Sequence, residues 1–444
     1  MSAIAAVVLA AGAGTRMRSS KSKVLHEIGG RPMVSHLLDT VNQLGTERVV
    51  VVTAPNMDAV QKQVAPATIA IQTDAKGTGH AVLSSLKALD GFSGDVLVLF
   101  GDCPLIKLET LTSMVKTRRE RAAAVAVLGF EPVDAAEYGR LVTNASGGLD
   151  AIVEYADADA ETRAIGICNS GVMVFDGAKL ASLVGAITDN NSKAEFYLTD
   201  VVEIANAQGL TCTYVIGDEL ELLGINNRVQ LAEAEQVLQS QWRQQAMYDG
   251  ATLIDPATVW LSHDTQIGKD VVIEPNVFIG PKVVIGDNVR IKAHSHLEGT
   301  TIGDRAQIGP FARLRPGANL ASDVRVGNFV EIKKAEIDTG AKISHLSYIG
   351  DAEVGSDANI GAGTITCNYD GFDKFVTKIG AGSFIGSNTA LVAPVTVGEG
   401  AIVGAGSTIT RNVEPNALVV ERSEEKQKPG WAERFRSLKK KITK

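Results

Sequence analysis

Cysteine is scarce in this chain of 444 residues. There are four cysteines, Cys103, Cys168, Cys212 and Cys367, and no two of them form a Cys-x-x-Cys pair. This scattering excludes a disulfide framework and a cysteine-rich zinc site, and it is typical of reduced thiols. The formal net charge is −8, so the chain also lacks the excess positive charge that non-specific binding to nucleic acid requires.

Long hydrophobic runs are missing as well. No stretch of the sequence approaches the roughly 20 apolar residues that a membrane-spanning helix needs. The apolar residues 3–11 have no Lys or Arg before them, as a signal peptide would, and Gly12, Gly14 and Arg16 follow at once. We therefore expect a buried first strand at this point, no membrane partner and a cytoplasmic protein.

The second half of the chain carries a short apolar repeat. From Leu261 to Ile409 an aliphatic residue recurs about every six positions, often followed by glycine. A six-residue repeat predicts a parallel β-helix, in which three short strands close one coil of roughly 18 residues. One coil cannot bury its own apolar side chains, so only the stack is stable. Three steps have five residues: Leu297 to Ile302, Ile332 to Ile337 and Ile349 to Val354.

The first half alternates short apolar runs with helix-compatible segments. The apolar runs are residues 4–9, 48–52, 96–100 and 122–128, and the helical segments include 33–44 and 79–89. This alternation predicts an α/β domain with a mostly parallel sheet covered on both faces, and ligands at the carboxyl ends of its strands. Good helix formers fill residues 227–247. We divide the chain into a domain at 1–226, a linker helix at 227–247 and a β-helix domain at 248–444.

Three polar turns follow predicted strands in the first half. The small residues from Gly12, with Arg16 and Lys23 close by, suit an anion. The turn at Gly77 suits a base or a phosphate, and Asp102, at the end of an apolar strand, suits a divalent cation. Each turn also fits a structural role, a tight turn in the first case and a helix N-cap in the others. The first turn is not a Walker motif and departs from Gly-x-Gly-x-x-Gly, which disfavours dinucleotide redox chemistry.

Seven motifs in order along the chain carry a family resemblance. They are Leu9-Ala-Ala-Gly-x-Gly-Thr-Arg-Met, Lys23-Val-Leu, Gly77-Thr-Gly-His, Gly101-Asp102, Tyr138-Gly-Arg, Ile152-Val-Glu154 and Gly224-Ile-Asn226-Asn-Arg. With the hexad domain, they resemble the bacterial bifunctional N-acetylglucosamine-1-phosphate uridylyltransferases / glucosamine-1-phosphate N-acetyltransferases over nearly the whole chain. The resemblance implies a Rossmann-like α/β nucleotidyltransferase domain followed by a left-handed parallel β-helix, and synthesis of UDP-N-acetylglucosamine for the cell wall.

The resemblance also implies a uridylyl-transfer site in the first half. The residues implied to bind UTP or the product are Leu9, Ala10, Ala11, Gly12, Arg16, Lys23, Gln72, Gly77, Thr78, Phe100, Gly101 and Asp102, with Gly139, Glu154, Asn169 and Asn226. Asp102 and Asn226 would bind Mg²⁺. A sugar phosphate oxygen would attack the α-phosphorus of UTP in line and release pyrophosphate. This nucleophile is already anionic, so positioning and charge neutralisation suffice.

Two residues near this site depart from the family pattern. Phe100 stands where the family usually has Tyr, and Ser22 replaces a common Pro before Lys23. Neither change removes a cation or a metal ligand, so we expect uridylyl transfer to persist.

The phase of the hexads locates a second site without reference to any family. With three hexads per coil, Leu314, Ile332, Ile349 and Thr366 stack on one face. Strand alternation then turns their neighbours outward onto one wall. The outward residues are Arg315, Glu331, Lys333 and Tyr348, with Asn359 on the adjoining face and His345 near the corner between them. Extra residues after Thr366 predict a loop beside this wall. Such charges also occur on ordinary solvated faces.

The resemblance assigns acetyl transfer to this wall. His345 would be the general base that takes a proton from the glucosamine 2-amine as it attacks the acetyl-CoA thioester. Arg315 and Lys333 would bind the sugar phosphate, and Tyr348 and Asn359 would orient the sugar. The residues implied for acetyl-CoA are Ala362, Asn368, Tyr369, Ser387, Ala405 and Arg422. The family's β-helices associate as homotrimers, with sites between subunits. The tail from residue 423 is basic, and we interpret most of it as solvated.

Two other functions remain open on the sequence. One is a sugar-1-phosphate nucleotidyltransferase of a single activity, such as the ADP-glucose type, with a structural β-helix. The other is a non-catalytic regulator built on the same folds, which loss of Asp102 or Lys23 would have favoured; both residues are present.

Overall fold

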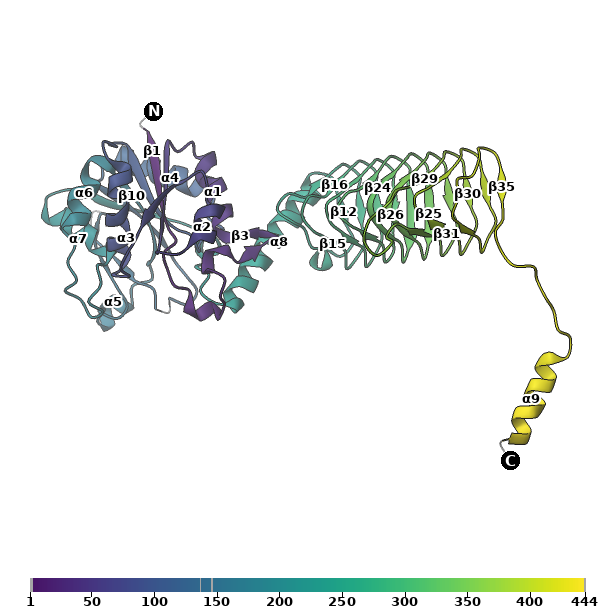
Figure 1. Cartoon of the computed structure of the whole chain (residues 1–444). Helices are drawn as coiled ribbons and strands as arrows, with labels where there is room; N and C mark the ends of the chain where they lie inside the picture. Colours follow the sequence, from purple (N-terminus) through teal and green to yellow (C-terminus); the bar gives the residue numbers. More distant parts are fainter. Residues whose placement is uncertain (1–2, 136, 145–146, 443–444) are drawn as a thin grey trace. The chain divides into compact units, whose positions relative to one another are not determined.

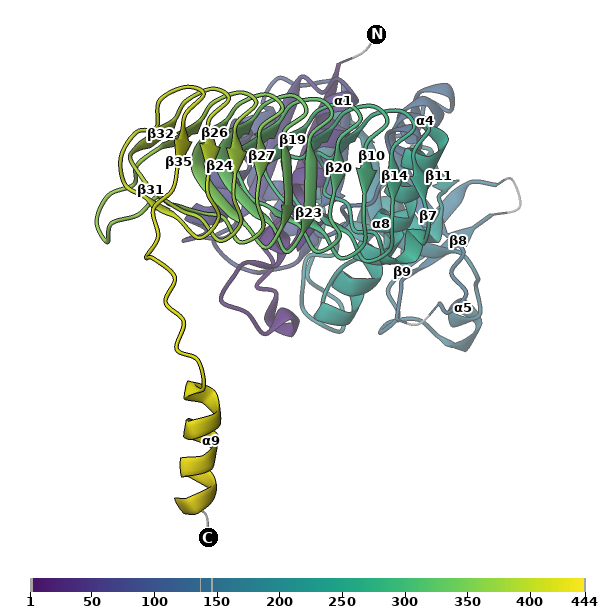
Figure 2. The same cartoon turned by 90° about the vertical axis from the view of Figure 1, so that its right-hand side faces the viewer.

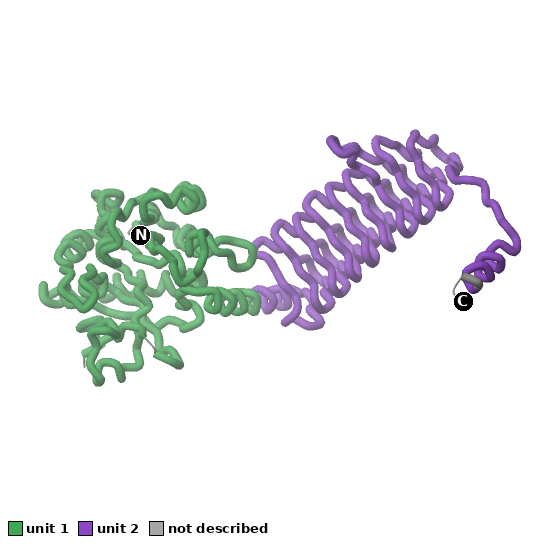
Figure 3. Tube along the Cα trace, turned by 60° about the horizontal axis from the view of Figure 1, so that its bottom comes forward, with its two compact units in different colours: residues 1–241 green, residues 242–444 purple. Residues whose placement is uncertain are grey.

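The computed structural model describes residues 3–135, 137–144 and 147–442 of the chain. It contains two compact units, Met1–Gln241 and Trp242–Lys444 (Figure 3). The boundary falls inside helix α8 (Arg228–Tyr248), so we keep the division into 1–226, 227–247 and 248–444 as a proposal. Within the described ranges, no helix is both long and apolar enough to cross a membrane.

A mixed sheet forms the centre of the first unit (Figure 1). Its main path runs β11-β7-β10-β6-β1-β4-β5. The strands are β1 (Ile4–Leu9), β4 (Arg48–Thr53), β5 (Thr68–Ile71), β6 (Asp95–Phe100), β7 (Val125–Phe130), β10 (Cys168–Asp176) and β11 (Cys212–Ile216). β8 (Arg140–Thr143) pairs with β10, and β9 (Leu149–Val153) pairs with β8. The pairs among β6, β1, β4 and β5 are parallel, as predicted. β10 is antiparallel to both β6 and β7, an insertion that the sequence pattern did not indicate.

Helices cover both faces of this sheet, which confirms the α/β prediction. α1 (Met33–Gln43), α2 (Asp58–Gln63) and α4 (Leu108–Glu120) contribute to one buried cluster. α3 (Thr78–Ser85), α6 (Gly177–Gly185) and α7 (Val201–Ala207) contribute to the other. Smaller elements are β2 (Glu27–Ile28), β3 (Arg31–Pro32), α5 (Ala160–Arg163) and the 3-10 turns η1 (Thr15–Met17), η2 (Lys23–Leu25), η3 (Leu86–Leu89), η4 (Leu198–Asp200) and η5 (Glu219–Leu222).

The second unit is a left-handed parallel β-helix, opened by η6 (Pro256–Thr258) and the strand before it. The hexads predicted the parallel β-helix, and the family resemblance implied its hand. Figure 2 shows one of its faces, where β14, β20, β23 and β27 lie side by side. The strands of this face are β12 (Thr252–Leu253), β14 (Val272–Ile273), β17 (Arg290–Ile291), β20 (Gln307–Ile308), β23 (Arg325–Asn328), β25 (Lys342–His345), β27 (Asn359–Ile360), β30 (Phe384–Ile385), β33 (Ile402–Val403) and β35 (Leu418–Val419).

Two long strands join the other two faces of the β-helix. β24 (Glu331–Ile337) and β26 (Tyr348–Val354) each run from one face onto the next. The five-residue steps predicted at Ile332 and Ile349 fall inside these strands. One face adds β13 (Gln266–Ile267), β16 (Val284–Ile285), β19 (Thr300–Ile302), β22 (Ala318–Leu320), β29 (Thr377–Ile379) and β32 (Val395–Val397). The other adds β15 (Phe278–Ile279), β18 (His296–Leu297), β21 (Arg313–Leu314), β28 (Ile365–Cys367), β31 (Ala390–Val392) and β34 (Thr408–Ile409).

The aliphatic residues of the hexads point inward and form one continuous core. Leu314 pairs with Ile332, and Ile332 pairs with Ile349 on the next coil. Tyr348 pairs with Ile365, which puts Ile349 opposite Thr366. The predicted stack of four is therefore confirmed.

The basic tail ends in a helix that the sequence interpretation left as solvated chain. α9 spans Trp431–Ile442. Residues 420–440 are all exposed, which confirms the prediction that most of the tail is solvated. The helix itself was not predicted from the sequence.

Candidate functional site

The two central strands of the first unit end at the same edge of the sheet. β1 and β6 pair in parallel with Leu9 opposite Phe100. Ala10 and Gly101 follow directly, and the Gly101 N–H donates to the Leu9 carbonyl at 2.9 Å. This edge is where ligands bind in open α/β sheets. At this edge β1 is followed by the glycine-rich turn, and β6 is followed by Gly101 and Asp102.

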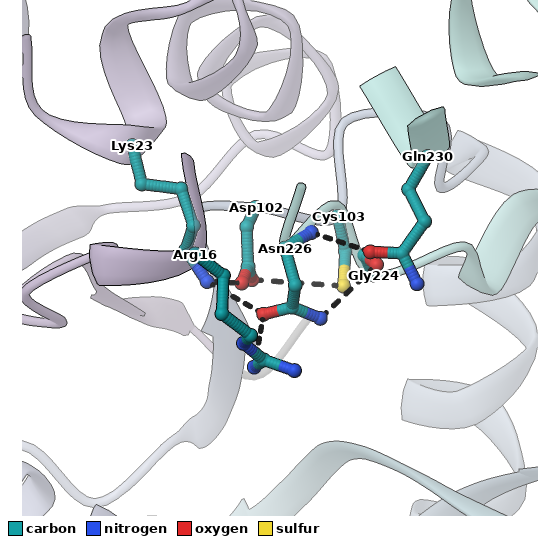
Figure 4. A network of polar contacts seen from close by, with 7 residues as sticks. All are labelled: Arg16, Lys23, Asp102, Cys103, Gly224, Asn226 and Gln230. Atoms are coloured by element: carbon teal, nitrogen blue, oxygen red, sulfur yellow. Dashed lines mark hydrogen bonds and ion pairs between the residues drawn. The ribbon is translucent and has the colours of Figure 1, made fainter. Parts of the chain in front are cut away.

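Four polar side chains meet at this edge (Figure 4). Lys23 Nζ donates to Asp102 Oδ2 and, at 3.1 Å, to Asn226 Oδ1. Arg16 Nη2 also donates to Asn226 Oδ1, at 2.9 Å. The structure therefore brings together the two cations and the two proposed metal ligands, from three separate parts of the chain.

Local structure holds each member of this group in place. Gly14 has φ 61°, and a Cβ there would lie 2.7 Å from Lys23 Cβ, so only glycine lets the turn pass this close to the lysine. The Ile225 N–H donates to the Asp102 carbonyl at 3.0 Å, which ties the segment before α8 to the end of β6. The Asn226 N–H donates to Gln230 Oε1 at 2.8 Å.

The oxygen atoms of Asp102 and Asn226 fit a hard divalent cation. Both oxygens accept from a single cationic group, the Lys23 ammonium, so they already converge on one positive charge. Mg²⁺ typically takes one or two protein oxygens and completes its shell with water and substrate phosphates. The described residues contain no cluster of three or more His, Cys, Asp or Glu that could hold a metal ion by themselves. Burial raises the pKa of the neighbouring Cys103 thiol, with the Asp102 charge adding to the effect.

The turn after β5 is built around Gly77. Its φ is 103°, and a Cβ would lie 2.6 Å from the Phe196 carbonyl oxygen. The Gln72 Nε2 donates to the Gly77 carbonyl at 3.1 Å, which holds this buried amide at the turn. Thr78 Oγ1 accepts from the Leu198 N–H at 3.1 Å. Gln72, Gly77 and Thr78, which are predicted to contact the uracil base, therefore lie together. The hydrogen bond of Thr78 also ties this turn to the segment around residue 199.

The predicted sugar-binding residues also meet. The Asn169 N–H donates to the Gly139 carbonyl at 2.8 Å. A Cβ on Gly139 would lie 3.5 Å from Glu154 Oε2. Thr199 Oγ1 donates to Glu154 Oε1 at 3.3 Å. Burial raises the pKa of Glu154, and its hydrogen bond from Thr199 opposes that shift.

Two residues of this region were missed from the sequence. Thr199 contacts Glu154 directly, and the buried Tyr197 hydroxyl has no hydrogen-bond partner among the described residues. No motif marks them, because Thr199 lies in η4 and Tyr197 directly before it, away from the motif turns. Burial raises the pKa of Asp200, the residue after Thr199, to about 6, and the Glu203 and Glu154 carboxylates add to the shift.

The Phe100 ring packs against the backbone of Gly171. A tyrosine at this position would differ from it only by the hydroxyl group. A Cβ on Gly171 would lie 2.6 Å from Phe100 Cε2, so the ring packs directly against this glycine. Gly171 has φ 85°, and its N–H donates to Asn169 Oδ1 at 2.9 Å. The ring therefore supports Asn169 by packing, which needs no hydroxyl.

The predicted wall of the β-helix is formed. Glu331 pairs with Tyr348, and Lys333 pairs with Gly350 on the next coil. Arg315 Nη1 donates to Glu331 Oε1 at 2.7 Å. A Cβ on Gly350 would lie 2.4 Å from the Tyr348 hydroxyl, so glycine makes room for this side chain on the wall.

A third cation was missed on this wall. The Lys374 ammonium, and after it the Arg315 guanidinium, lower the pKa of Lys333. Lys374 lies in the loop between β28 and β29, beyond the reach of the hexad phase. Three cations that repel one another in this way form a site for an anion such as a phosphate.

One corner of the β-helix carries a row of predicted acetyl-transfer residues. Asn328 pairs with His345 on the next coil. The Gly363 N–H donates to the His345 carbonyl, the Asn388 N–H to the Ala362 carbonyl, and the Gly406 N–H to the Ser387 carbonyl. The row, one residue per coil, is Asn328, His345, Ala362, Ser387 and Ala405. Arg422 Nη1 donates to the Ala405 carbonyl at 3.1 Å and closes the row.

His345 is exposed and held by one polar partner. Its Nδ1 lies 2.8 Å from Asn328 Oδ1. A carbonyl oxygen can only accept, so the Nδ1–H donates to it, and in the neutral imidazole the lone pair is then on Nε2. The strand ends at this residue, since Leu346 has φ 50°. The predicted placement near the corner is therefore confirmed, with Asn359 on the same face in β27.

The predicted loop leaves the coil after β28. Asn368 Nδ2 donates to Asp351 Oδ2, which anchors the start of the loop. Asp370 Oδ1 accepts from the Phe372 and Asp373 N–H groups, both at 2.8 Å. Tyr369 is 59% exposed, so its ring is available to a ligand.

Comparison with known proteins agrees with both halves. The family model for the MobA-like NTP transferase domain matches residues 6–165. The model for six repeats of the bacterial transferase hexapeptide matches residues 264–299 and 377–411.

Curated relatives match almost the full chain. The bifunctional protein GlmU of Paramagnetospirillum magneticum is 58% identical over 437 residues, which are 98% of this chain and 97% of that protein. The bifunctional protein GlmU of Rhodospirillum rubrum is 54% identical over 444 residues, 100% of this chain and 99% of that protein. That of Maricaulis maris is 56% identical over 436 residues, 98% of this chain and 96% of that protein. The chain therefore belongs to the family of the bifunctional protein GlmU, as its sequence motifs indicated.

Proposed function

We propose that this chain makes UDP-N-acetylglucosamine in two reactions at two separate sites. The β-helix transfers the acetyl group of acetyl-CoA to glucosamine-1-phosphate. The first unit then transfers the uridylyl group of UTP to the N-acetylglucosamine-1-phosphate and releases pyrophosphate. The observation that carries the proposal is that each unit holds its own group of polar side chains. The first unit has Arg16 and Lys23 with the oxygens of Asp102 and Asn226, and the second has the exposed His345 on one face and three cations on another.

For acetyl transfer, His345 is the proposed general base. The Asn328 carbonyl fixes the Nδ1–H tautomer, so Nε2 takes a proton from the glucosamine 2-amine as the amine attacks the thioester carbon. The C–N bond forms, the C–S bond breaks, and the proton finally reaches the CoA thiolate. Arg315, Lys333 and Lys374 hold the sugar phosphate.

Acetyl-CoA is proposed to follow the corner row toward this base. Ala362, Ser387 and Ala405 are small, and each lies one coil beyond the last, about 4.8 Å per step. Arg422, at the end of the row, is placed to meet the phosphates of the cofactor. Asn368 and Tyr369 contribute from the loop.

For uridylyl transfer, positioning and charge are enough. Arg16 and Lys23 neutralise the phosphates of UTP, while Asp102 and Asn226 are the proposed ligands of Mg²⁺. The metal would supply charge neutralisation at the triphosphate. Lys23 occupies both ligand oxygens in this structure, so binding of the metal requires the lysine to turn toward the phosphates. Glu154 and Asn169, held by Thr199 and Gly139, orient the sugar.

We propose a homotrimer through the β-helix. Phe311, Phe329 and Leu346 occupy turn positions of the β-helix with positive φ angles of 55°, 54° and 50°. They are 45%, 57% and 61% exposed, and the two phenyl rings stack at 5.2 Å. A bulky residue in this left-handed conformation costs about 1–2 kcal/mol, and the other left-handed turn positions of the β-helix carry polar or charged residues or glycine. A second copy that covers these side chains accounts for their retention, beside the corner that carries His345.

Two paired assays test the proposal. Purified protein with Mg²⁺ is given acetyl-CoA and glucosamine-1-phosphate in one tube, and free thiol is followed. It is given UTP and N-acetylglucosamine-1-phosphate in the other, and pyrophosphate is followed. A nucleotidyltransferase with a structural β-helix would release pyrophosphate alone, and a regulator would give neither signal.

Two variants separate the sites. His345→Ala should abolish thiol release and leave pyrophosphate release intact, and Asp102→Ala should do the reverse. His296→Ala, another exposed histidine of the β-helix, is the matched control and should leave both rates unchanged. Loss of both activities in a folded single variant would contradict the two-site assignment.

A further inference from the structure

The C-terminal helix α9 has an apolar stripe that no described residue covers. Trp431, Phe435 and Leu438 follow the i, i+4, i+7 spacing of one helix face, and they are 57%, 45% and 61% exposed. The Trp431 and Phe435 rings stack at 5.1 Å, so the stripe is already organised. At 100° per residue, Arg434 and Lys439 flank the stripe on opposite sides. The helix thus presents apolar side chains between two rows of positive charge.

The tail that carries α9 differs in charge from the rest of the chain. Residues 423–444 hold eight Lys and Arg against three Glu, a net charge of +5, while the whole chain has −8. The remaining residues therefore carry a net charge of −13. A basic segment attached to an acidic protein is attracted to acidic surfaces of that protein, especially at low salt.

A groove along one edge of the β-helix has the complementary character. Its volume is 780 Å³, and it runs over five successive coils at the end of the β22–β24–β26–β29–β32 face. Its floor includes Gly355, Gly380 and Gly398, where a Cβ would come within 2.5, 2.5 and 2.4 Å of the next coil's backbone, so these three positions must lack a side chain. The aliphatic residues that line the groove beside them are Leu320, Ile337, Val354, Ile379 and Val397. We call this feature the edge groove.

The rim of the edge groove is acidic. Glu336 and Glu353 pair in register on neighbouring coils, and Asp338 and Glu399 line the same groove. Among the described residues that line the groove, Lys378 is the one cation, and it is paired with Glu353 at 3.0 Å. A narrow apolar floor between carboxylates is the counterpart of an apolar stripe between cations.

The lengths agree as well. Five coils at about 4.8 Å spacing give a groove of roughly 19 Å, and a helix of 12 residues is about 18 Å long. The 11 exposed residues 420–430 join β35 to α9. At about 3.3 Å per residue they reach roughly 36 Å, which is enough to bring α9 to any part of the groove on its own chain.

We propose that α9 binds in the edge groove of its own β-helix, with Trp431, Phe435 and Leu438 on the glycine floor and its cations on the acidic rim. Tethering by a short linker raises the effective concentration to the millimolar range, so weak contacts are sufficient. The bound helix restrains the segment that follows Arg422 and so keeps this residue beside Ala405. The inference does not depend on the proposed activities.

Disulfide trapping in the full chain tests this placement. Glu336→Cys lies on the groove rim, and Arg434→Cys lies on the flank of α9. The matched control pairs Arg434→Cys with Glu298→Cys, another exposed glutamate of the β-helix outside the groove. The three fully buried native cysteines and Cys367 are common to both proteins. The rate of disulfide formation under mild oxidation is followed on non-reducing gels.

The expected result is a disulfide within one chain that forms at least tenfold faster for the groove pair than for the control pair. The advantage should shrink at 1 M NaCl because salt screens the rim charges. Equal rates for the two pairs would overturn the proposal, and cosedimentation of the wild-type protein with phosphatidylglycerol vesicles would then identify lipid as the partner. A band of twice the chain mass as the main product would also overturn it, in favour of the groove of a second copy.

Discussion

The hydrogen bond between His345 and Asn328 makes a quantitative prediction for acetyl transfer. Asn328→Leu keeps the approximate size of the side chain and removes the oxygen that accepts from Nδ1–H at 2.8 Å. A hydrogen bond of this kind contributes about 1–1.5 kcal/mol. Because each 1.36 kcal/mol changes a rate about tenfold, kcat for thiol release should fall roughly 5–15-fold. The KM values for both substrates should change less than twofold, since Asn328 orients the base and does not contact the sugar phosphate.

A second variant separates this orienting role from a general structural effect. Asn328→Asp keeps the acceptor and adds a negative charge beside the imidazole, which stabilises its protonated form. The variant should retain most of the rate at high pH, and the acid limb of its pH–rate profile should move to higher pH. Gln307→Leu, a change of the same kind on an exposed strand of the same face, is the control. Uridylyl transfer, which takes place in the other unit, should be unaffected in every case.

The reasoning would be refuted by an Asn328→Leu protein whose thiol release stays within twofold of wild type. It would also be refuted if Asn328→Asp and wild type gave superimposable pH profiles. Either result would mean that the base does not depend on this partner for its tautomer.

The remaining predictions concern glycine, charge and pH. Gly14→Ala and Gly45→Ala each place alanine at positive φ and should each cost about 1–2 kcal/mol of stability in chemical denaturation, but only Gly14→Ala puts a Cβ 2.7 Å from a Lys23 atom and should lose uridylyl transfer. Lys374→Met should raise KM for glucosamine-1-phosphate severalfold, and less at high salt, because one of three cations is lost. Asp200→Asn should stabilise the protein at pH 7.5 by about 1 kcal/mol, less than a two-unit shift implies because the group is partly exposed. Its pKa of about 6 lies above the usual 3.8, so the ionised form carries a cost above pH 6 that fades by about pH 4, and the gain in Tm should fade with it.

The hexad pattern predicted the second unit in detail, because the position of a residue within its hexad determines which face of the β-helix it lies on and whether it points inward. It put Arg315, Lys333 and Tyr348 on one wall, as the register has them. The shortened steps kept that phase because β24 and β26 absorb them while they turn from one face to the next. In the first unit the strand positions were predicted to within a few residues, for example 122–128 against Val125–Phe130.

What the sequence left out depends on contacts between distant segments. Lys374 belongs to a loop that no repeat governs, and its position follows from how the loop folds over the wall. Thr199 and Tyr197 join the sugar site only because η4 packs beside the end of β9, which local pattern does not encode. The antiparallel β10 was missed because a buried strand has the same apolar composition in either direction. α9 was missed because its polar residues outweigh its narrow apolar stripe.

The corner row also fixes the distances between its residues along the β-helix axis. Each coil adds one residue to the row and one fixed increment of about 4.8 Å, so the separation between His345 and Ala405 can change only in whole coils. An insertion of one whole hexad would move every later residue to another face, unless it is expelled as a loop, whereas one-residue changes are absorbed inside β24 and β26. Residues 368–376 are such an expelled insertion, and β28 and β31 still pair in register across it. The distance between the proposed base and the proposed acetyl-CoA contacts therefore changes only in steps of one coil. Insertions and deletions among homologues of this domain should be found mainly in its loops.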